Sequence, residues 1–360
     1  MSSKHACVSE QKHWVGSVLA HLLFLSFLWL AVSVPTQAQL LVLVSEPDEE
    51  SIWVGAVDSA TGVLTKATAT IDGCCEIYSG LTAVDRQQEL LFAVGRFVSG
   101  DQQGQLALMT FSFDGESVVT VLPATTPNAW LAFDQSSGLL YSATFSADEG
   151  SGWFSLNPET GASMTLGEPD ADCCEMFTGQ AQVANLAEGR GVYFLARALE
   201  REAGDDRWHL WVTDLATGLS RQLIELPEGH PSFFRMDEKG EQALLMMQQT
   251  PSGAAVLYEV DLIDSITTTK ASHAIDDCCW VGQGSVADLS ANQRAWWLLG
   301  NGAEGASLDA GYFSLFANSN SRSQFHQSLP SAYQLHAMVI NGQVLDRSGI
   351  FADQFQSAPE

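Results

Sequence analysis

The sequence is poor in basic residues. Of its 360 residues, 16 are Lys or Arg and 43 are Asp or Glu, so the formal net charge is −27. Nucleic acids and anionic membranes are bound through clustered Lys and Arg side chains, and this balance argues against both partners. The acidic residues are scattered and not gathered in runs, which predicts a solvated, self-repelling surface.

Helical and catalytic patterns are also lacking. No segment sustains the apolar period of an amphipathic helix, which argues against helical fold classes. The chain has no serine nucleophile elbow, no P-loop and no Rossmann glycine pattern between a strand and a helix. The sequence therefore points to no particular reaction.

Long apolar stretches are absent except near the N-terminus. Two lysines precede an apolar stretch from Trp14 to Val34, and the small residue Ala38 follows it closely. This order predicts a signal peptide over residues 1–38 that is cleaved after Ala38. An uncleaved anchor is the alternative, because the stretch is nearly long enough to span a bilayer. We expect a periplasmic or secreted protein with no membrane span after cleavage.

Seven cysteines are present, and cleavage of the signal removes Cys7. An even number in an exported protein favours disulfide bonds. Neighbouring Cα atoms lie about 3.8 Å apart, below the usual disulfide range, so a bond between neighbours closes a strained small ring. We favour three such vicinal disulfides, with free dithiols and bridges between pairs as alternatives. The six cysteines are Cys74 and Cys75, Cys173 and Cys174, and Cys278 and Cys279.

A glycine stands six residues after the first cysteine of each pair, at Gly80, Gly179 and Gly284. Such a recurrent glycine predicts a backbone position that needs positive φ or close approach.

A longer sequence pattern recurs six times: an apolar stretch that ends in Asp or Asn, a turn, and another apolar stretch. Each unit of about 50 residues reads as two hairpins, that is, four short strands. This pattern predicts an all-β fold, a six-bladed β-propeller over residues 39–349, with a disordered tail over residues 350–360. The closing residues, which we interpret as turn formers, are Asp85, Asp134, Asn185, Asp237, Asp288 and Asn341.

The two ends of the mature chain are expected to share one blade. Residues 40–57 match the second and third strands of a unit, and residues 335–341 match a first strand. Sharing a blade would remove exposed sheet edges.

This strand–turn–strand rhythm resembles the exported TolB-like and lactonase-like propellers. The resemblance covers the whole mature chain at the level of architecture. It implies the fold and no catalytic residue.

The units alternate in kind. Cysteine pairs precede the first strands of units one, three and five, whereas units two, four and six carry proline, two residues and an aromatic at Trp130, Phe234 and Tyr333. The chain should therefore have pseudo-three-fold symmetry. Because the entry to each first strand lies near the central channel of such a propeller, we expect the six turns to ring one channel mouth.

This ring is the candidate site, and three interpretations compete for it. The turns could be structural and plug the channel, or they could bind a sugar, another ligand or a protein partner. They could also hold a soft metal such as Cu(I), or act in thiol redox chemistry. The predicted site residues are Cys74, Cys75, Cys173, Cys174, Cys278, Cys279, Trp130, Phe234, Tyr333, Asp72, Asp172, Asp277, Glu76 and Glu175, with Asp276 and His230 beside them.

From these features we predict a monomeric, non-enzymatic binding or scaffold module without a cofactor. The alternative is an enzyme, either a metal-dependent hydrolase with bound Ca²⁺ or a soft-metal or thiol redox protein that uses the same ring.

Overall fold

A computed structural model describes most of the chain between residues 39 and 341. The predicted signal peptide and the predicted tail fall outside the described residues. All described residues belong to one compact unit, Ala38–Glu360. Among them every regular element is a β-strand, and no helix is long and apolar enough to cross a membrane. The gaps are residues 47–49, 58–62, 114, 123–129, 147–149, 171–172, 188, 199–206, 237–238, 250–253, 275–280, 290–291, 300–310, 317–322 and 327–333.

Three antiparallel sheets have four strands each, in chain order. Apolar runs form their strands, and turns rich in Asp, Asn and Gly separate them. The first contains β5 (Glu76–Asp85), β6 (Leu90–Arg96), β7 (Leu106–Ser112) and β8 (Ser117–Val121). The second contains β17 (His230–Met236), β18 (Gln242–Gln248), β19 (Ala254–Asp261) and β20 (Ile266–Ala274). The third contains β21 (Val281–Leu289), β22 (Asn292–Leu299), β23 (Gly311–Phe316) and β24 (Ser323–His326).

A fourth sheet has eight strands and contains two of the predicted units. Its first half is β9 (Trp130–Asp134), β10 (Leu139–Ser146), β11 (Gly150–Leu156) and β12 (Ser163–Asp170). Its second half is β13 (Glu175–Leu186), β14 (Gly189–Arg197), β15 (His209–Asp214) and β16 (Ser220–Glu225).

Because these two units share a sheet, the structure has five sheets, and the predicted count of six blades is wrong. The joint between the halves is short and parallel: Gly179 pairs with Trp130, and Gln180 with Leu131. It forms where β13 departs from its register with β14, which brings the backbone of residues 179–180 alongside the start of β9. Within each half the four strands are antiparallel, as the repeat predicts.

The fifth sheet closes the fold and confirms that both chain ends share it. Strand β25 (Gln334–Asn341) pairs with β1 (Gln39–Glu46), which pairs with β2 (Ser51–Val57), and β3 (Leu64–Lys66) and β4 (Ile71–Asp72) pair with β2. The β1–β25 register shifts between Leu43 and Val44, close to His336.

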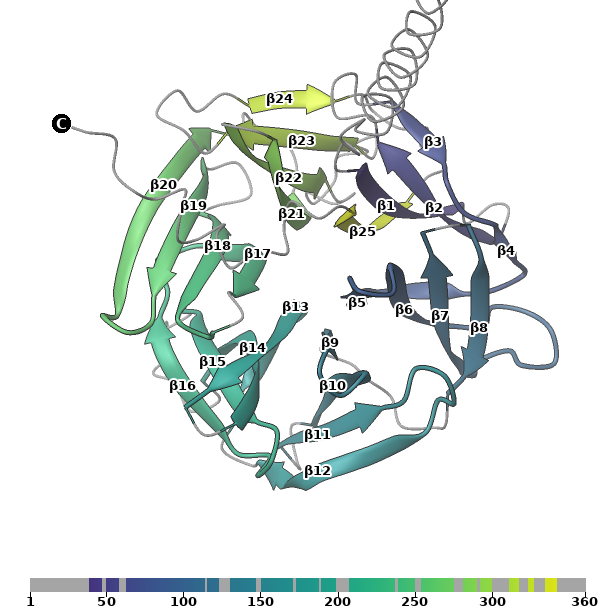
Figure 1. Cartoon of the computed structure of the whole chain (residues 1–360), viewed down its shortest axis with the longest axis horizontal. Helices are drawn as coiled ribbons and strands as arrows, with labels where there is room; N and C mark the ends of the chain where they lie inside the picture. Colours follow the sequence, from purple (N-terminus) through teal and green to yellow (C-terminus); the bar gives the residue numbers. More distant parts are fainter. Residues whose placement is uncertain are drawn as a thin grey trace, which may run out of the picture. The chain divides into compact units, whose positions relative to one another are not determined.

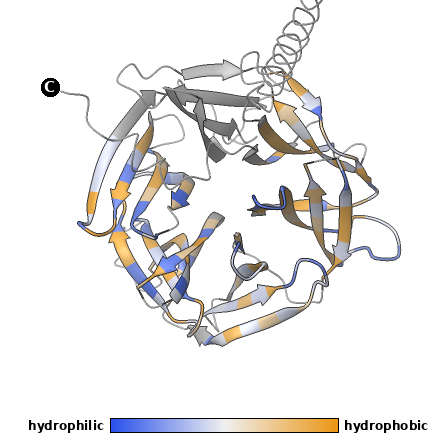
Figure 2. Cartoon of the chain, viewed as in Figure 1, coloured by the Kyte–Doolittle hydropathy of each residue, from blue (hydrophilic) through white to orange (hydrophobic). Residues whose placement is uncertain are grey.

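The first strands of the units line the middle of the arrangement (Figure 1). Strands β5, β9, β13, β17, β21 and β25 each contact the next, and β25 contacts β5 again, so the series is closed. This closed ring of twisted antiparallel sheets is a β-propeller. Hydrophobic residues lie mainly along the strands (Figure 2).

The core lies between consecutive units. One cluster joins β1 and β2 to β5–β7, a second joins β5–β7 to β9–β11, a third joins β9–β11 to β13–β15, and a fourth joins β13–β15 to β17–β19. A small sheet thus buries both faces only because neighbours cover them, which is why the repeats are stable as a ring and not singly.

Two closing residues are confirmed as turn formers. The Asp85 carboxylate accepts hydrogen bonds from the backbone N–H groups of Gln87 and Gln88, and Asp134 accepts one from that of Ser136. Both carboxylates also bond to the following unit, since Gln135 donates to Asp85 at 2.8 Å and Arg190 donates to Asp134 at 2.5 Å. We call this side of the sheets the corner end.

Burial alone would raise the pKa of the Asp134 carboxyl. Hydrogen bonds from Ser137 and Ser136 and the charge of Arg190 outweigh that effect and lower its pKa. The corner end is therefore held by turn hydrogen bonds and by links between units.

Candidate functional site

Two vicinal disulfides confirm the prediction for the pairs that the structure describes. Cys74 is bonded to Cys75 and Cys173 to Cys174, with 3.5 Å between the Cα atoms of each pair. The first pair directly precedes β5 and the second directly precedes β13. The third pair, Cys278 and Cys279, lies outside the described residues. We call the side of the sheets where these turns lie the cysteine end.

The sulfur atoms of both bonds lie inside the protein. Cys74 and Cys75 are 4% and 5% exposed, and Cys173 and Cys174 are 1% and 0% exposed. Each pair packs within a hydrophobic core cluster between two units. This burial agrees with the structural interpretation of the pairs, because a buried disulfide has little access to a ligand or a thiol reagent.

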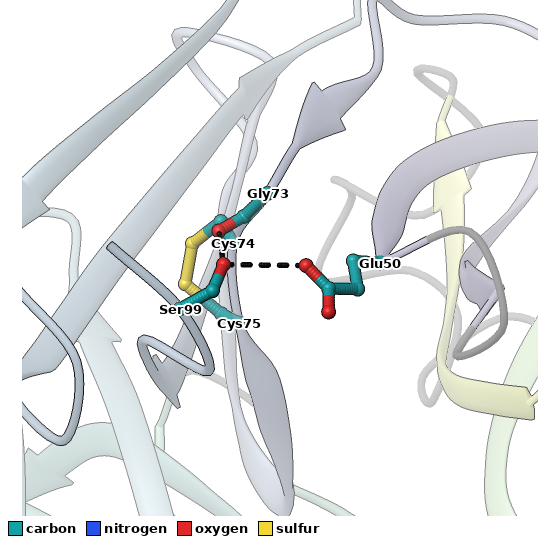
Figure 3. The surroundings of a disulfide bond; sticks show 5 residues. All are labelled: Glu50, Gly73, Cys74, Cys75 and Ser99. Carbon is teal, nitrogen blue, oxygen red and sulfur yellow. Dashed lines mark hydrogen bonds between the residues drawn. A yellow bond between two sulfur atoms is a disulfide. The ribbon is translucent and has the colours of Figure 1, made fainter.

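Hydrogen bonds hold the turn around the first pair (Figure 3). The Ser99 hydroxyl donates to the Glu50 carboxylate at 3.2 Å and to the Gly73 carbonyl oxygen at 3.3 Å. The Gly73 N–H donates to the Glu50 carbonyl oxygen at 3.0 Å. Gly73 has a φ of 68°, where glycine is favoured. Three chain segments thus fix the backbone that leads into Cys74.

A bulge follows each described cysteine pair. The register of β5 with β6 shifts between Ile77 and Thr82, and that of β13 with β14 shifts between Met176 and Ala181. Gly80 within the first bulge has a φ of 83°, which confirms the expected positive φ there. Bulges change the direction of side chains and are common beside functional sites.

In the first bulge, the ring of Tyr78 lies under a guanidinium. Arg96 at the end of β6 lies over this ring, 5.7 Å from its centroid. Arg96 is exposed and Tyr78 half-buried, and Glu76 is the register partner of Arg96 across the two strands.

In the second bulge, Phe177 takes the place of Tyr78 and belongs to a larger group. Arg197 lies over the ring of Trp208 at 4.2 Å. The rings of Phe177, Trp208 and His230 meet edge to face, with centroids 5.5 to 5.9 Å apart. We call these four side chains the Trp208 cluster. Trp208 is 5% exposed, whereas the other three are half-buried, so the cluster has a buried base and an accessible rim.

His230 is predominantly neutral near pH 7. Partial burial lowers the pKa of His230, and the positive charge of Arg197 lowers it further, although a contact with the Pro231 carbonyl oxygen opposes both effects. The His230 Nδ1 atom lies 3.1 Å from that oxygen. The ring therefore contributes a polar, neutral edge beside the guanidinium.

The predicted aromatic ring residues lie mostly elsewhere. Trp130 is 1% exposed and packs beside Trp153 and Phe194, and Phe234 is 4% exposed in the next cluster, so both are core side chains. Tyr333 lies outside the described residues.

The structure describes some of the predicted acidic residues. Asp72 and Glu76 are exposed and Glu175 is half-buried. Asp172, Asp276 and Asp277 lie outside the described residues, so the rim contacts predicted for them remain predictions. In the part of the chain that the structure describes, no three His, Cys, Asp or Glu side chains gather in a way that could hold a metal ion.

His230 is among the residues predicted from the sequence, whereas Arg96, Arg197 and Trp208 are not. A signal was available for part of the set. An aromatic residue stands four positions after the first cysteine in two copies, at Tyr78 and Phe177, whereas the third copy has Gly282 there. The arginines stand far from the cysteines in sequence, and only the strand pairing brings them to the same end.

Comparison with known proteins supports the fold alone. No family model matches the chain, and no curated protein matches it in sequence. The structure is similar to TolB from Acinetobacter baumannii, with a TM-score of 0.55 and 10% identity over 90% of this chain and 72% of TolB. It is also similar to a chain of a nidogen/laminin complex, with a TM-score of 0.53 and 10% identity over 84% of this chain and 98% of that one. These similarities support the TolB-like propeller architecture.

Proposed function

We propose that the mature protein is an exported binding module whose ligand site is at the cysteine end. The observation that carries the proposal is the stacking of Arg197 on Trp208 at the rim of that end, with a related pair in Arg96 and Tyr78. Arginine and aromatic side chains dominate the energetics of recognition sites, because both combine a large contact area with directional polar groups.

The polar side chains at the two ends of the sheets differ in exposure, and this difference supports the proposal. At the corner end, Asp85 and Asp134 are 1% and 2% exposed and their oxygens are engaged in turns and links between units. At the cysteine end, buried disulfides and bulges fix the backbone, and they leave half-buried rings and guanidinium groups at the surface. A rigid backbone with accessible side chains reduces the entropy cost of binding.

In this proposal the disulfides support the site and do not contact the ligand. In place of the cysteines and aromatic residues predicted from the sequence, we propose Phe177, Arg197 and His230 as the ligand contacts.

A ligand-observed NMR screen of simple sugars and small organic acids against the mature protein tests the proposal. We expect compounds whose saturation-transfer signal is lost in Phe177→Ala, at the cysteine end. The same signal should persist in Arg190→Ala, at the corner end, and circular dichroism establishes that both variants fold. If no compound binds, or if every binding compound is indifferent to Phe177→Ala, the proposal is wrong. Metal analysis of the purified protein tests the alternative of a metal-dependent enzyme, which stoichiometric Ca²⁺ or copper would favour.

A further inference from the structure

Four buried polar groups gather at the junction between the second and third units. The indole N–H groups of Trp130 and Trp153 and the hydroxyl of Ser151 belong to the second unit, and the indole N–H of Trp211 belongs to the third. None of the four has a hydrogen-bond partner among the residues that the structure describes. Buried donors without a partner are costly and rare in native proteins, so these groups indicate a partner from outside the chain.

The strands place these groups on surfaces that face each other. Ser151 stands two residues before Trp153 on β11, so the two side chains lie on the same face of the sheet. Trp211 is the register partner of Phe194 across β14 and β15. The ring of Phe194 lies 5.6 Å from that of Trp130 and 5.2 Å from that of Trp153, measured between centroids. The four tryptophan and phenylalanine rings thus form one cluster between the units, together with the second disulfide.

The neighbouring ring faces do not serve as acceptors for Trp130 and Trp153. An indole N–H lies in the plane of its own ring, so it points at a neighbouring face only when the two rings are close to perpendicular. The planes of Trp130 and Trp153 meet at 28°, those of Trp130 and Phe194 at 32°, and those of Trp153 and Phe194 at 49°. None of these pairs is perpendicular, in contrast to the edge-to-face rings of the Trp208 cluster.

The missing partner must be an acceptor. An indole can only donate a hydrogen bond, whereas the serine hydroxyl can both donate and accept. A neutral oxygen or a small anion would satisfy such a set. Taking an anion out of water without a paired cation is very costly, and the formal net charge of −27 opposes it further. These costs favour the neutral acceptor.

Water is the smallest neutral acceptor and suits a closely packed junction. A buried water typically makes about three hydrogen bonds, and it commonly bonds polar groups that protein atoms leave unpaired. The oxygen of Ser151 can accept one of its hydrogens, while the indoles donate to its oxygen. Trp130 and Trp153 are 1% and 2% exposed and Ser151 is 0% exposed, so the site is separated from bulk solvent.

We propose that the junction between the second and third units holds buried water, bonded to the indole N–H groups of Trp130, Trp153 and Trp211 and to the hydroxyl of Ser151. The site is internal and does not depend on the ligand site proposed at the cysteine end. It lies between the two units whose first strands, β9 and β13, also pair through their backbones. Water therefore adds a second polar link between the units that share one sheet.

Water-selected NMR of the ¹⁵N-labelled mature protein tests the proposal at each indole. We expect cross-peaks between water and the Hε1 protons of Trp130, Trp153 and Trp211, with opposite signs in NOE and ROE spectra. Proton exchange gives the same sign in both spectra and is distinguished in this way. The indole of Trp53 is the internal control and should give no such peak, because its N–H donates to the Glu46 carboxylate. Single substitutions of tryptophan by phenylalanine assign the resonances.

Two serine variants form a matched pair. Ser151 and Ser142 are 0% and 1% exposed in the same unit, but the Ser142 hydroxyl donates to the Trp130 carbonyl oxygen at 2.5 Å. Ser151→Ala should reduce the water cross-peak of at least one of the three indoles by about twofold or more, because the water loses a partner. Ser142→Ala should leave all three cross-peaks unchanged. If Ser151→Ala does not fold, the wild-type spectra decide.

Titration with sodium chloride and with sodium sulfate at matched ionic strength separates water from an anion. Shifts of the three Hε1 resonances that saturate with chloride and not with sulfate would overturn the proposal in favour of an anion site. The proposal also fails if the three indoles give no stronger water cross-peaks than Trp53, or if Ser142→Ala weakens them as much as Ser151→Ala. None of these results bears on the proposed binding module, which is tested by the loss of ligand signal in Phe177→Ala.

Discussion

The two described disulfides are both followed by a bulge, and they lie in different surroundings. Around Cys74 and Cys75 the core cluster is mostly aliphatic, with Leu43, Val54 and Met109 among its members. The cluster around Cys173 and Cys174 is rich in aromatic side chains, and its members include Trp130, Trp153, Phe194 and Trp211. A bulge and a cross-strand Glu–Arg register pair follow in both cases.

The buried disulfide is common to both described copies, whereas the group of aromatic side chains belongs to one of them. Both described copies have a small apolar group of fixed shape just before the first strand of the unit, β5 or β13. A buried disulfide is this group in either type of core. Among the described residues, three rings meet at the surface beside the second disulfide and the junction that follows it, whereas the bulge after the first disulfide has the single ring of Tyr78 under Arg96. We therefore interpret the repeated features as the scaffold, and the features that differ between the two copies as the location of the proposed site.

The largest expected effect tests whether Trp130 is a core residue or a ligand contact. Because its ring is 1% exposed between Trp153 and Phe194, Trp130→Ala should lower the free energy of unfolding by about 3–5 kcal/mol. Urea denaturation of the mature protein measures this loss. A stability change below about 1 kcal/mol would contradict the aromatic core described for the second disulfide.

Much of the fold could be predicted from the sequence because residue types typical of turns mark the ends of its hairpins. The corner residues Asp85 and Asp134 fix the ends of hairpins locally, and the spacing of such residues gives the units. The pairing of β25 with β1 follows from strand phrases at the two ends of the chain. The sheet count was wrong because the two-residue joint of β9 and β13 depends on a bulge, which no local pattern specifies.

The candidate site was harder to predict, because the burial of a side chain depends on the sheets packed against it and these are distant in sequence. Trp130 and Phe234 follow prolines in turn-like sequence, which suggests exposure, yet adjacent sheets cover both. The cysteine pairs could be recognised as vicinal disulfides because few geometries suit adjacent cysteines. The bond between Cys278 and Cys279 remains a prediction, and failure of alkylation without reductant would support it.

The closing sheet beside the first disulfide should make stability depend on pH. Burial lowers the pKa of His336 to about 4, and its ring lies 2.6 Å from the Ser45 hydroxyl oxygen. Because the unfolded chain binds the proton more readily, stability should fall as pH drops below about 6.5 and level off near about 4, by at most about 3 kcal/mol.

His336→Gln should remove that part of the pH dependence, as urea denaturation at pH 7 and pH 4.5 would show. Asp134→Asn serves as the control, because a carboxyl whose pKa is lowered loses its contribution only at more acidic pH. Equal pH dependence in the wild type and in His336→Gln would contradict the role given to the closing strand.

The close packing of the first disulfide can be tested at Gly95. A Cβ atom at this position would lie 2.5 Å from the Glu76 carbonyl oxygen and 3.2 Å from the Cys75 Cβ atom. The register places Ala196 at the corresponding position of the second repeat. Gly95→Ala should therefore destabilise the protein by about 1–3 kcal/mol through overpacking.

Ala196→Gly is the matched change and should cost about 1 kcal/mol, mainly through backbone entropy. If both substitutions cost the same, or if Gly95→Ala is neutral, the two disulfide turns are packed more alike than the structure indicates.

The smallest expected effect compares the two arginines of the cysteine end. Arg197 lies 4.2 Å from the centroid of a buried indole, whereas Arg96 is exposed and lies 5.7 Å from the centroid of Tyr78. A cation on a desolvated ring contributes about 2 kcal/mol and an exposed one about 0.5–1 kcal/mol. Arg197→Ala should therefore destabilise the protein by roughly 1 kcal/mol more than Arg96→Ala in parallel urea titrations. If both variants lost the same free energy of unfolding, stacking on Trp208 would not stabilise Arg197 more than Tyr78 stabilises Arg96. The two repeats would then not differ in how firmly they hold their arginine.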